Sequence, residues 1–240
     1  MRGRDGPVDV VAACGMRLRL FPMTNRCEKR AVSGMHHWDH RERGVLLRAL
    51  DRADRGRPFV FLDIGANVGL YAITVGCHAA AFGHPVRIVA VEPDDTNATR
   101  LRVNAELNGI AVELLRTAIG ERSGTGRMVG GTTNRGEVRF ETVAEPCAMD
   151  HHTAMTRMIS LTDLCAARGI RQIDAMKIDI EGYDLAALRG MFAAAARSLW
   201  PRLLIVELGR GPSEIGALLR DVGYTVRQRT GINGIFELTA

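Results

Sequence analysis

Residues 59–76 read FVFLDIGANVGLYAITVG, and this stretch decides the fold. A continuous apolar run ends at Asp63, and Gly65 and Gly69 follow before the apolar residues resume with a different spacing. A run that is apolar at nearly every position is typical of a strand buried on both faces, as in a parallel sheet covered by helices. The turn after Asp63 therefore predicts the passage from a buried strand into a helix.

The same alternation continues along the chain. Apolar runs at 58–64, 86–92, 111–118, 173–178 and 202–208 alternate with helical patterns near 67–82, 94–108, 184–197 and 212–222. This order predicts an α/β, doubly wound, Rossmann-like fold with a mostly parallel sheet. The final segments YTVRQR and GIFELT, joined by a short glycine-bearing turn, predict two strands and an antiparallel C-terminal edge.

Two segments depart from the alternation. Within residues 1–57, VDVVAACGMRLRLF predicts a hairpin, and Asp39 is a candidate cap for a helix running to about Asp54. We expect this segment to form a cap or lid on the domain of residues 58–240. The polar stretch GGTTNRGE lies within residues 120–155, which predict an insertion of short strands or loop.

Composition restricts the class of protein. The chain has 240 residues, 46% hydrophobic and 25% charged, and no apolar run approaches the length of about 20 residues that crosses a bilayer. Its five cysteines form an odd set without a C-x-x-C pair, which favours reduced thiols over disulfides or a zinc site. We therefore expect a soluble, cytoplasmic protein with no membrane partner.

The net charge of +5 originates in the first 57 residues, which contain 13 basic and 7 acidic residues. These charges are scattered, which favours a solvated arm over a nucleic-acid surface. Only Lys29 and Lys177 among the 32 basic residues are lysines. The composition is compatible with a homo-oligomer.

The turn after the first strand has the spacing of a cofactor site. Ligands of open α/β sheets bind outside the carboxyl ends of strands, and Gly65, Asn67 and Gly69 lie at such an end. A dinucleotide site would need G-x-G-x-x-G, and Asp63 would repel a pyrophosphate but attract the ammonium group of an amino acid. This pattern favours S-adenosylmethionine over NAD(P), although a plain tight turn is the alternative. Glu92 ends the second strand, where it can accept hydrogen bonds from a ribose.

The fourth apolar run ends in KIDIEG. The carboxylates of Asp179 and Glu181 could take a proton from an attacking hydroxyl, or hold a divalent cation such as magnesium with Glu207 as a third member. Alternatively, Asp179 caps the following helix and Glu181 accepts backbone amides at its N-terminus.

Several motifs in order resemble the FkbM-type family of S-adenosylmethionine-dependent methyltransferases. They are DIGANVGLYA, VEPDDTNATRLRVNAELNG, SLTDLCAARGIRQIDAMKIDIEGYDLAALRG and LLIVELG, within residues 59–209. The resemblance implies a class I methyltransferase fold with a seven-stranded sheet. It implies that the methionine side of the pocket is formed by Asp63, Gly65, Asn67 and Gly69. It also implies that Glu92 and Pro93 lie at the ribose, and that Thr117 and Ala118 lie near the adenine. Lys177 belongs to the family's signature.

The stretch MHHWDH places His36, His37 and His40 within five residues. A metal pair or a catalytic base is one interpretation, but no third ligand follows at a convincing spacing, which favours solvated imidazoles at a helix entry. In proteins of the resembled fold, the segment before the first strand often covers the cofactor, which gives Trp38 and His40 interest in acceptor choice.

The leading hypothesis is transfer of a methyl group from S-adenosylmethionine to a hydroxyl of a small molecule, such as a sugar, a polyketide or another secondary metabolite. One alternative is an NAD(P)-dependent oxidoreductase. Another is a nucleic-acid methyltransferase that uses the basic N-terminal segment, but the sequence ends its fourth strand in DIEG rather than an Asn/Asp-Pro-Pro-aromatic loop, which disfavours nucleic acid. A domain that binds cofactor without turnover is a further alternative.

Overall fold

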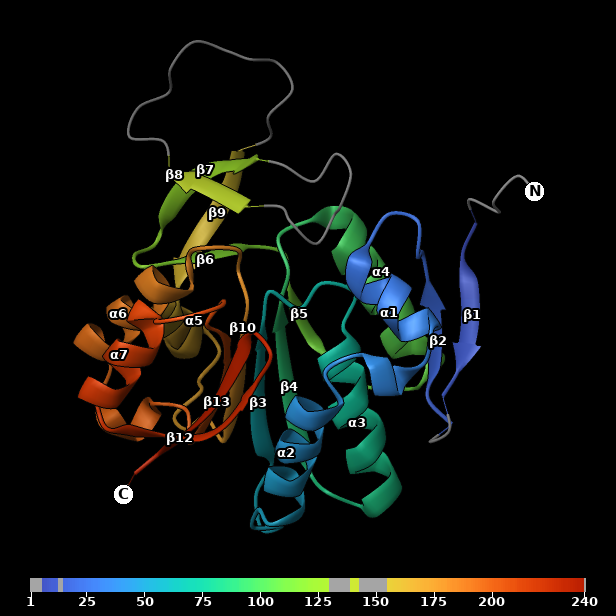
Figure 1. Ribbon diagram of the computed structural model, residues 1–240, viewed down its shortest axis with the longest axis horizontal. Coiled ribbons are helices and arrows are strands. Elements are labelled where there is room, and N and C mark those ends of the chain that lie inside the picture. The colour runs from blue at the N-terminus through green and yellow to red at the C-terminus, as the bar shows by residue number, and fades with distance from the viewer. Residues whose placement is uncertain (1–5, 13–14, 130–138, 143–154, 240) are drawn as a thin grey trace.

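The computed structural model describes residues 6–12, 15–129, 139–142 and 155–239. Its centre is a seven-stranded sheet in the order β12-β13-β11-β10-β3-β4-β5 (Figure 1). The strands are β3 (Phe59–Ile64), β4 (Val86–Val91), β5 (Glu113–Leu115), β10 (Ala175–Ile178), β11 (Leu203–Glu207), β12 (Tyr224–Thr230) and β13 (Asn233–Leu238). The chain enters at β3 and winds first toward β5, then from β10 toward the other edge. The neighbouring strands β3 and β10 therefore mark the switch point at which open α/β sheets bind ligands.

The central strand β3 is parallel to both β4 and β10. Phe59 and Phe61 pack into the hydrophobic core on one face of the sheet, and Leu62 and Ile64 pack into the core on the other. Burial on both faces explains why the strand is apolar until Asp63, which confirms the interpretation of this stretch.

The sheet is mostly parallel, and its antiparallel strand is β13. The two C-terminal strands form the predicted antiparallel edge, in which β13 lies between β11 and β12. Ile235 and Phe236 of β13 are fully buried, but Arg227 and Arg229 of β12 are exposed. A strand with apolar residues is stabilised between two neighbours, and charged side chains suit a strand at an edge.

Helices cover both faces of the sheet (Figure 1). One face carries α2 (His40–Asp51), α3 (Leu70–Phe82) and α4 (Asp95–Leu107), and the other carries α5 (Leu161–Ala167), α6 (Asp184–Ala194) and α7 (Glu214–Asp221). Each of the four helices predicted after residue 58 is present. The sequence missed α5, because seven residues are too few to show a helical period. No helix in the described ranges is both long and apolar enough to cross a membrane.

The segment before β3 contains the predicted hairpin, formed by β1 (Val8–Val11) and β2 (Arg17–Leu20). The short helix α1 (Arg26–Val32) and a 3₁₀ turn at Met35–His37 follow. The amides of Arg17 and Arg19 donate to the side chains of Asn108 and Asn104 at 2.8 Å, which attaches the hairpin to the end of α4. The role of residues 1–57 as a cap or lid stays a prediction.

A second sheet, in the order β6-β9-β7-β8, lies beyond the carboxyl end of β5 (Figure 1). Its strands are β6 (Ala118–Gly120), β7 (Gly124–Val129), β8 (Arg139–Thr142) and β9 (Met155–Ser160). The strand predicted over 111–118 is therefore divided, because the chain leaves the central sheet after Leu115 and joins the second sheet at Ala118. Residues 130–138 and 143–154 of the predicted insertion lie outside the described residues.

Candidate active site

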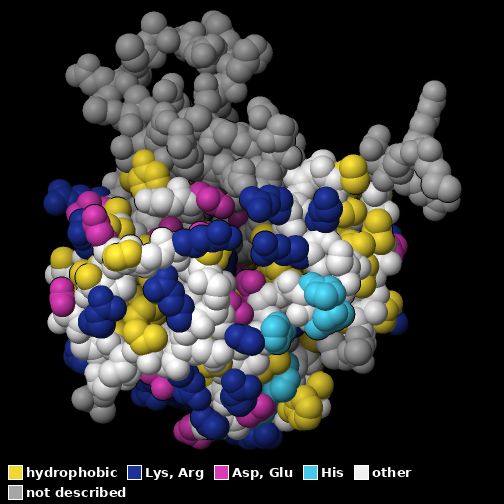
Figure 2. All heavy atoms as spheres, viewed as in Figure 1, with side chains coloured by type: hydrophobic (Ala, Val, Ile, Leu, Met, Phe, Trp, Pro, Cys, Tyr) yellow, Lys and Arg dark blue, Asp and Glu magenta, His cyan; other side chains and the backbone are white. Residues whose placement is uncertain are grey.

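A cavity of about 980 Å³, including its open mouth, lies at the carboxyl ends of β3, β4 and β10. Figure 2 shows a hollow near the centre of the displayed face, with acidic side chains at its edge and basic side chains on either side. Its walls come from the N-terminal segment, the β3–α3 turn, and the residues that follow β4, β5 and β10. The cavity therefore occupies the place that the switch point predicts.

The β3–α3 turn forms one wall. Gly65 has a left-handed φ of 72°, and a Cβ there would lie 1.9 Å from the carbonyl oxygen of Asp179, so only glycine fits. Asn67 is also left-handed, with a φ of 53°. Its amide donates to Glu92 Oε2 at 2.7 Å, and its side chain accepts from Asn25 Nδ2 at 2.6 Å. The turn is thus fixed between the end of β4 and the start of α1.

Two of the predicted loop residues lie behind this wall rather than on it. Gly69 has a φ of 83° at the start of α3, next to Leu101. Asp63 is 1% exposed, and its Oδ2 accepts from the amide of Ala72 at 3.1 Å. Its Oδ1 has no hydrogen-bond partner in the described part of the chain, and burial raises the pKa of this carboxyl to about 6. Asp63 therefore supports the β3–α3 turn from the side away from the cavity. Its contact with the ammonium group of a ligand stays a prediction.

Lys177 is the register partner of Asp63 in the β3–β10 pair. Its Nζ donates to the carbonyl oxygen of Gly65 at 3.1 Å, lies 3.3 Å from Asp179 Oδ2, and is 5.8 Å from the ring centre of Tyr71. Burial lowers the pKa of Lys177, but the carboxylates of Asp179 and Asp63 outweigh it and raise the pKa above its ordinary value. This buried cation joins the turn to the end of β10, which gives a physical task to the lysine that stood out in the sequence.

Glu92 lies in the cavity wall at the end of β4 and is 6% exposed. Its Oε2 holds the Asn67 amide, and its Oε1 accepts from the amide of Asp94 at 3.0 Å. Burial raises the pKa of Glu92 to about 7. Each carboxylate oxygen can accept more than one hydrogen bond, so Glu92 can still bind hydroxyl groups of a ligand.

The wall beyond Glu92 is mostly apolar. Pro93, Thr117 and Ala118 line it, together with Ile119. Thr117 is 9% exposed, and its hydroxyl donates to the carbonyl oxygen of Arg157 at 2.7 Å, so that its methyl-bearing carbon is held in place. An apolar wall next to a carboxylate suits a planar heterocycle attached to a sugar.

Asp179 and Glu181 both line the cavity after β10. Asp179 does not cap α6: the N-cap residue is Tyr183, and Asp184 instead accepts from the amide of Ile180 at 3.1 Å. Glu181 is exposed and has a left-handed φ of 51°. The structure therefore brings both predicted catalytic carboxylates to the cavity but pairs one of them with Lys177.

The described residues contain no group of three or more His, Cys, Asp or Glu side chains placed to hold a metal ion. Glu207, the third predicted acid, is half-buried at the end of β11 and does not line the cavity. His36, His37 and His40 are exposed. Cys27, Cys77 and Cys165 form no disulfide bond within the described residues, and Cys14 and Cys147 lie outside them.

Sequence reasoning missed a pair on the remaining wall, Asp39 and Tyr71. Helix α2 does begin after Asp39, but the carboxylate makes no capping bond, and its Oδ2 accepts the Tyr71 hydroxyl at 3.1 Å. The ring of Trp38 meets that of Tyr71 edge-on, with centroids 4.9 Å apart. The sequence shows a tyrosine just after the glycine turn, but the partner lies 32 residues earlier, so no local pattern reveals the pair.

Known proteins resemble this chain in sequence and in fold. It is 27% identical over 198 residues to the 31-O-demethyl-FK506 methyltransferase FkbM of Streptomyces tacrolimicus, an alignment that covers 70% of this chain and 73% of the relative. A crystal structure of an S-adenosylmethionine-dependent methyltransferase from Agrobacterium tumefaciens has a TM-score of 0.52 at 11% identity, covering 98% of this chain and 70% of that one. A structure of WbdD with a kinase inhibitor has a TM-score of 0.50 at 13% identity, covering 84% and 41%. At such identities the likeness to these two structures shows the fold alone.

The family comparison extends over most of the sheet. The model of the methyltransferase FkbM domain matches residues 63–228, which is more than half of the chain. The match contains the β3–α3 turn, Glu92 and both carboxylates after β10, whereas Asp39 lies outside it. Together with the class I fold, this match shows that the chain belongs to the FkbM family of methyltransferases.

Proposed function

We propose that this protein transfers the methyl group of S-adenosylmethionine to a hydroxyl oxygen of a small molecule, such as a sugar or a polyketide. The observation that carries the proposal is that two kinds of surface line one cavity. Glu92 and apolar residues form the first, and the carboxylates of Asp39, Asp179 and Glu181 form the second. The first surface suits a nucleoside, and the second can accept the proton of a hydroxyl.

The residues present fit the cofactor on two counts. Glu92 is a buried carboxylate that lines the cavity, and it retains acceptor capacity beyond its hydrogen bonds with the amides of Asn67 and Asp94 and the Asn97 side chain. Gly65 lines the cavity with backbone alone, because a Cβ there would collide with the Asp179 carbonyl oxygen. We assign Gly65 and Asn67 to the methionine portion, Glu92 and Pro93 to the ribose, and Thr117 with Ala118 to the adenine. Asp63 and Gly69 hold this wall from behind.

The cofactor, when bound, supplies a methyl group on a positively charged sulfur. The protein must then align an acceptor and dispose of its proton, and alignment contributes much of the rate in such displacements. Asp179 and Glu181 are the two carboxylates that the sequence singled out for contact with the acceptor. The relative from Streptomyces tacrolimicus is named for 31-O-demethyl-FK506, and we extend the class of a hydroxylated metabolite to this chain.

Calorimetry with S-adenosylhomocysteine and with NADH tests the cofactor. We expect binding of the first and none of the second, and the reverse result would remove the proposal in favour of an oxidoreductase. The acceptor is tested with methyl-labelled S-adenosylmethionine and a panel that contains 31-O-demethyl-FK506, a methyl glycoside and a cyclic diol, each with magnesium and with EDTA. Label on nitrogen or on RNA added to the same assay, with none on the hydroxyl compounds, would overturn the acceptor class.

A further inference from the structure

Three residues other than glycine have a left-handed backbone in the described part of the chain: Asp39, Asn67 and Glu181, with φ values of 39°, 53° and 51°. All three line the active-site cavity. Such conformations are disfavoured for residues with a Cβ, and they cluster at sites where the surrounding structure requires a side chain in one place. Asp39 differs from the other two because it lies outside the family match at residues 63–228.

The carboxylate of Asp39 is directed away from the helix that it precedes. An aspartate at this position ordinarily accepts a hydrogen bond from an amide of the first helical turn. Asp39 makes no such bond, and its Oδ2 accepts from the Tyr71 hydroxyl at 3.1 Å. Tyr71 is 3% exposed, and burial together with the Asp39 charge raises its pKa well above the ordinary value, so it remains a donor. Helix α2 therefore lacks a side-chain cap while the carboxylate lies in the cavity.

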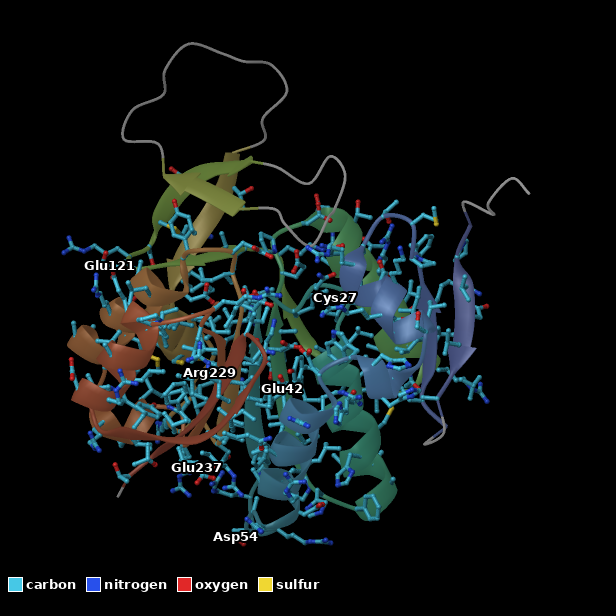
Figure 3. The ribbon with its side chains drawn as sticks, in the orientation of Figure 1. Cys27, Glu42, Asp54, Glu121, Arg229 and Glu237 are labelled. Atoms are coloured by element: carbon cyan, nitrogen blue, oxygen red, sulfur yellow. The ribbon has the colours of Figure 1, made fainter. Side chains whose placement is uncertain are left out.

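Rigid elements hold Asp39 in this position. Glu42, one turn further along α2, is 4% exposed and accepts hydrogen bonds from Asn233 Nδ2 at 2.8 Å and from the Thr230 hydroxyl. Figure 3 shows Glu42 between α2 and the strands of the central sheet. The ring of Trp38 packs edge-on against the ring of Tyr71, which holds the hydroxyl that Asp39 contacts. A catalytic group needs such support, because small displacements lose the reactive geometry.

Charged and titratable groups face Asp39 from every element around it. They are Cys27, Glu42, Tyr71, Lys177, Asp179 and Glu207. Burial and the Glu42 carboxylate raise the pKa of Asp39, against the opposing effects of the Tyr71 hydrogen bond and the Lys177 charge. A carboxylate with a raised pKa is a stronger proton acceptor than an ordinary aspartate.

We propose that Asp39 is the general base that takes the proton of the acceptor hydroxyl, and that Tyr71 is its positioning residue. The inference rests on the proposed O-methyl transfer. In this step the acceptor O–H bond breaks, and the proton moves to an Asp39 carboxylate oxygen. The freed electron pair of the acceptor oxygen forms the bond to the methyl carbon, and the pair of the breaking C–S bond stays on sulfur. Asp39 is then neutral until it releases the proton to solvent.

Asp179 is less suited to this task. Its Oδ2 lies 3.3 Å from the ammonium of Lys177. This ion pair already engages one carboxylate oxygen of Asp179. Asp39 instead accepts from the neutral hydroxyl of Tyr71, and this difference in partners is why we assign the proton to Asp39.

The first measurement needs no acceptor. Carboxyl-carbon NMR of protein labelled at aspartate, with S-adenosylhomocysteine bound, identifies Asp39 as the resonance that is lost in Asp39→Asn. We expect this resonance to titrate above the ordinary aspartate value. Titration at or below that value overturns the proposal, whatever the acceptor is.

The second measurement compares Asp39→Asn with Asp51→Asn, the same substitution at the far end of α2. We expect both variants to bind S-adenosylhomocysteine within about threefold of the wild type by calorimetry. Asp39→Asn should transfer methyl groups to the best compound of the panel at least about 100-fold more slowly, and Asp51→Asn should be unchanged. The wild-type kcat/KM should fall as the pH drops through the Asp39 pKa, because the base must be ionised. Tyr71→Phe should move this fall in kcat/KM to higher pH, because the substitution removes a hydrogen bond that stabilises the ionised form of Asp39.

The outcomes separate the two proposals. If Asp39→Asn keeps more than about a tenth of the transfer rate with an unchanged acidic limb, Asp39 is not the base. If the wild type binds S-adenosylhomocysteine but methylates no compound of the panel, the proposed acceptor class fails. The NMR titration then decides on Asp39 by itself.

Discussion

Substitution of Gly65 by alanine tests whether the position of the β3–α3 turn depends on its contact with the end of β10. The new Cβ would lie 1.9 Å from the Asp179 carbonyl oxygen, so the two segments must separate by more than about 1 Å to reach the 3.0 Å that real contacts respect. Forcing extra volume into a packed site costs about 1–3 kcal/mol. A left-handed backbone at alanine adds about 1–2 kcal/mol. We therefore expect Gly65→Ala to lower the free energy of unfolding by about 2–5 kcal/mol.

Gly83→Ala is the matched control, because Gly83 has a similar φ of 67° but no atom within 4 Å of the added Cβ. It should lose only the backbone contribution of about 1–2 kcal/mol and bind S-adenosylhomocysteine as the wild type does. Gly65→Ala should bind about 100-fold more weakly, because both cavity walls move by about an ångström. Denaturant unfolding and calorimetry measure the two effects. Equal losses of stability in both variants, with unchanged binding, would refute the close-approach argument.

Further predictions concern Glu92 and the contact between α1 and the β3–α3 turn. Folding raises the pKa of Glu92 from 4.5 to about 7, so the folded, ligand-free protein binds this proton more tightly than the unfolded chain does. Its free energy of unfolding should therefore fall by up to about 3 kcal/mol as the pH rises from 4.5 to 7. Glu92→Gln should flatten this pH dependence of stability, which denaturant unfolding at pH 5 and pH 8 measures. An unchanged dependence in the variant would contradict the assignment. In the wild type, the affinity for S-adenosylhomocysteine should rise with pH. Asn25→Ala removes the cap of α1 and the 2.6 Å bond to Asn67, so it should cost about 1 kcal/mol of stability and weaken cofactor binding. In a double-mutant cycle with Asn67→Gly, which keeps the left-handed turn, strictly additive binding losses would show that the two residues are not coupled.

The elements that the sequence predicted well are those whose periodicity spans many residues. The helices α3, α4, α6 and α7 lie within or close to their predicted ranges, because each presents enough apolar positions to show a period. The helices α1 and α5 have seven residues each and were missed. The order of β12 and β13 in the sheet did not follow from the sequence. A hairpin pattern indicates that two strands pair, but it does not indicate which of them lies next to β11.

The site divides in the same way. Gly65, Asn67 and Glu92 were recognisable because their spacing around one strand and helix is local. The Asp63 carboxylate lies behind the turn and accepts from the amide of Ala72, which depends on the direction that its side chain takes from β3. Its contact with a ligand stays a prediction. Asp39 looked like a helix cap, and only its distance to the Tyr71 hydroxyl shows that the carboxylate faces the cavity.

By itself, the sequence determined the α/β class, the position of the cofactor turn after β3 and the family resemblance that the domain match confirms. These features depend on burial of whole strands and on glycine at a few positions, which neighbouring residues reveal. The tertiary structure decided which carboxylates meet. Lys177 forms an ion pair with Asp179, and the Asp39 carboxylate contacts Tyr71 instead of its own helix. Such pairings form between segments far apart in the chain, because close packing of α2, α3 and β10 at one end of the sheet sets their distances and burial.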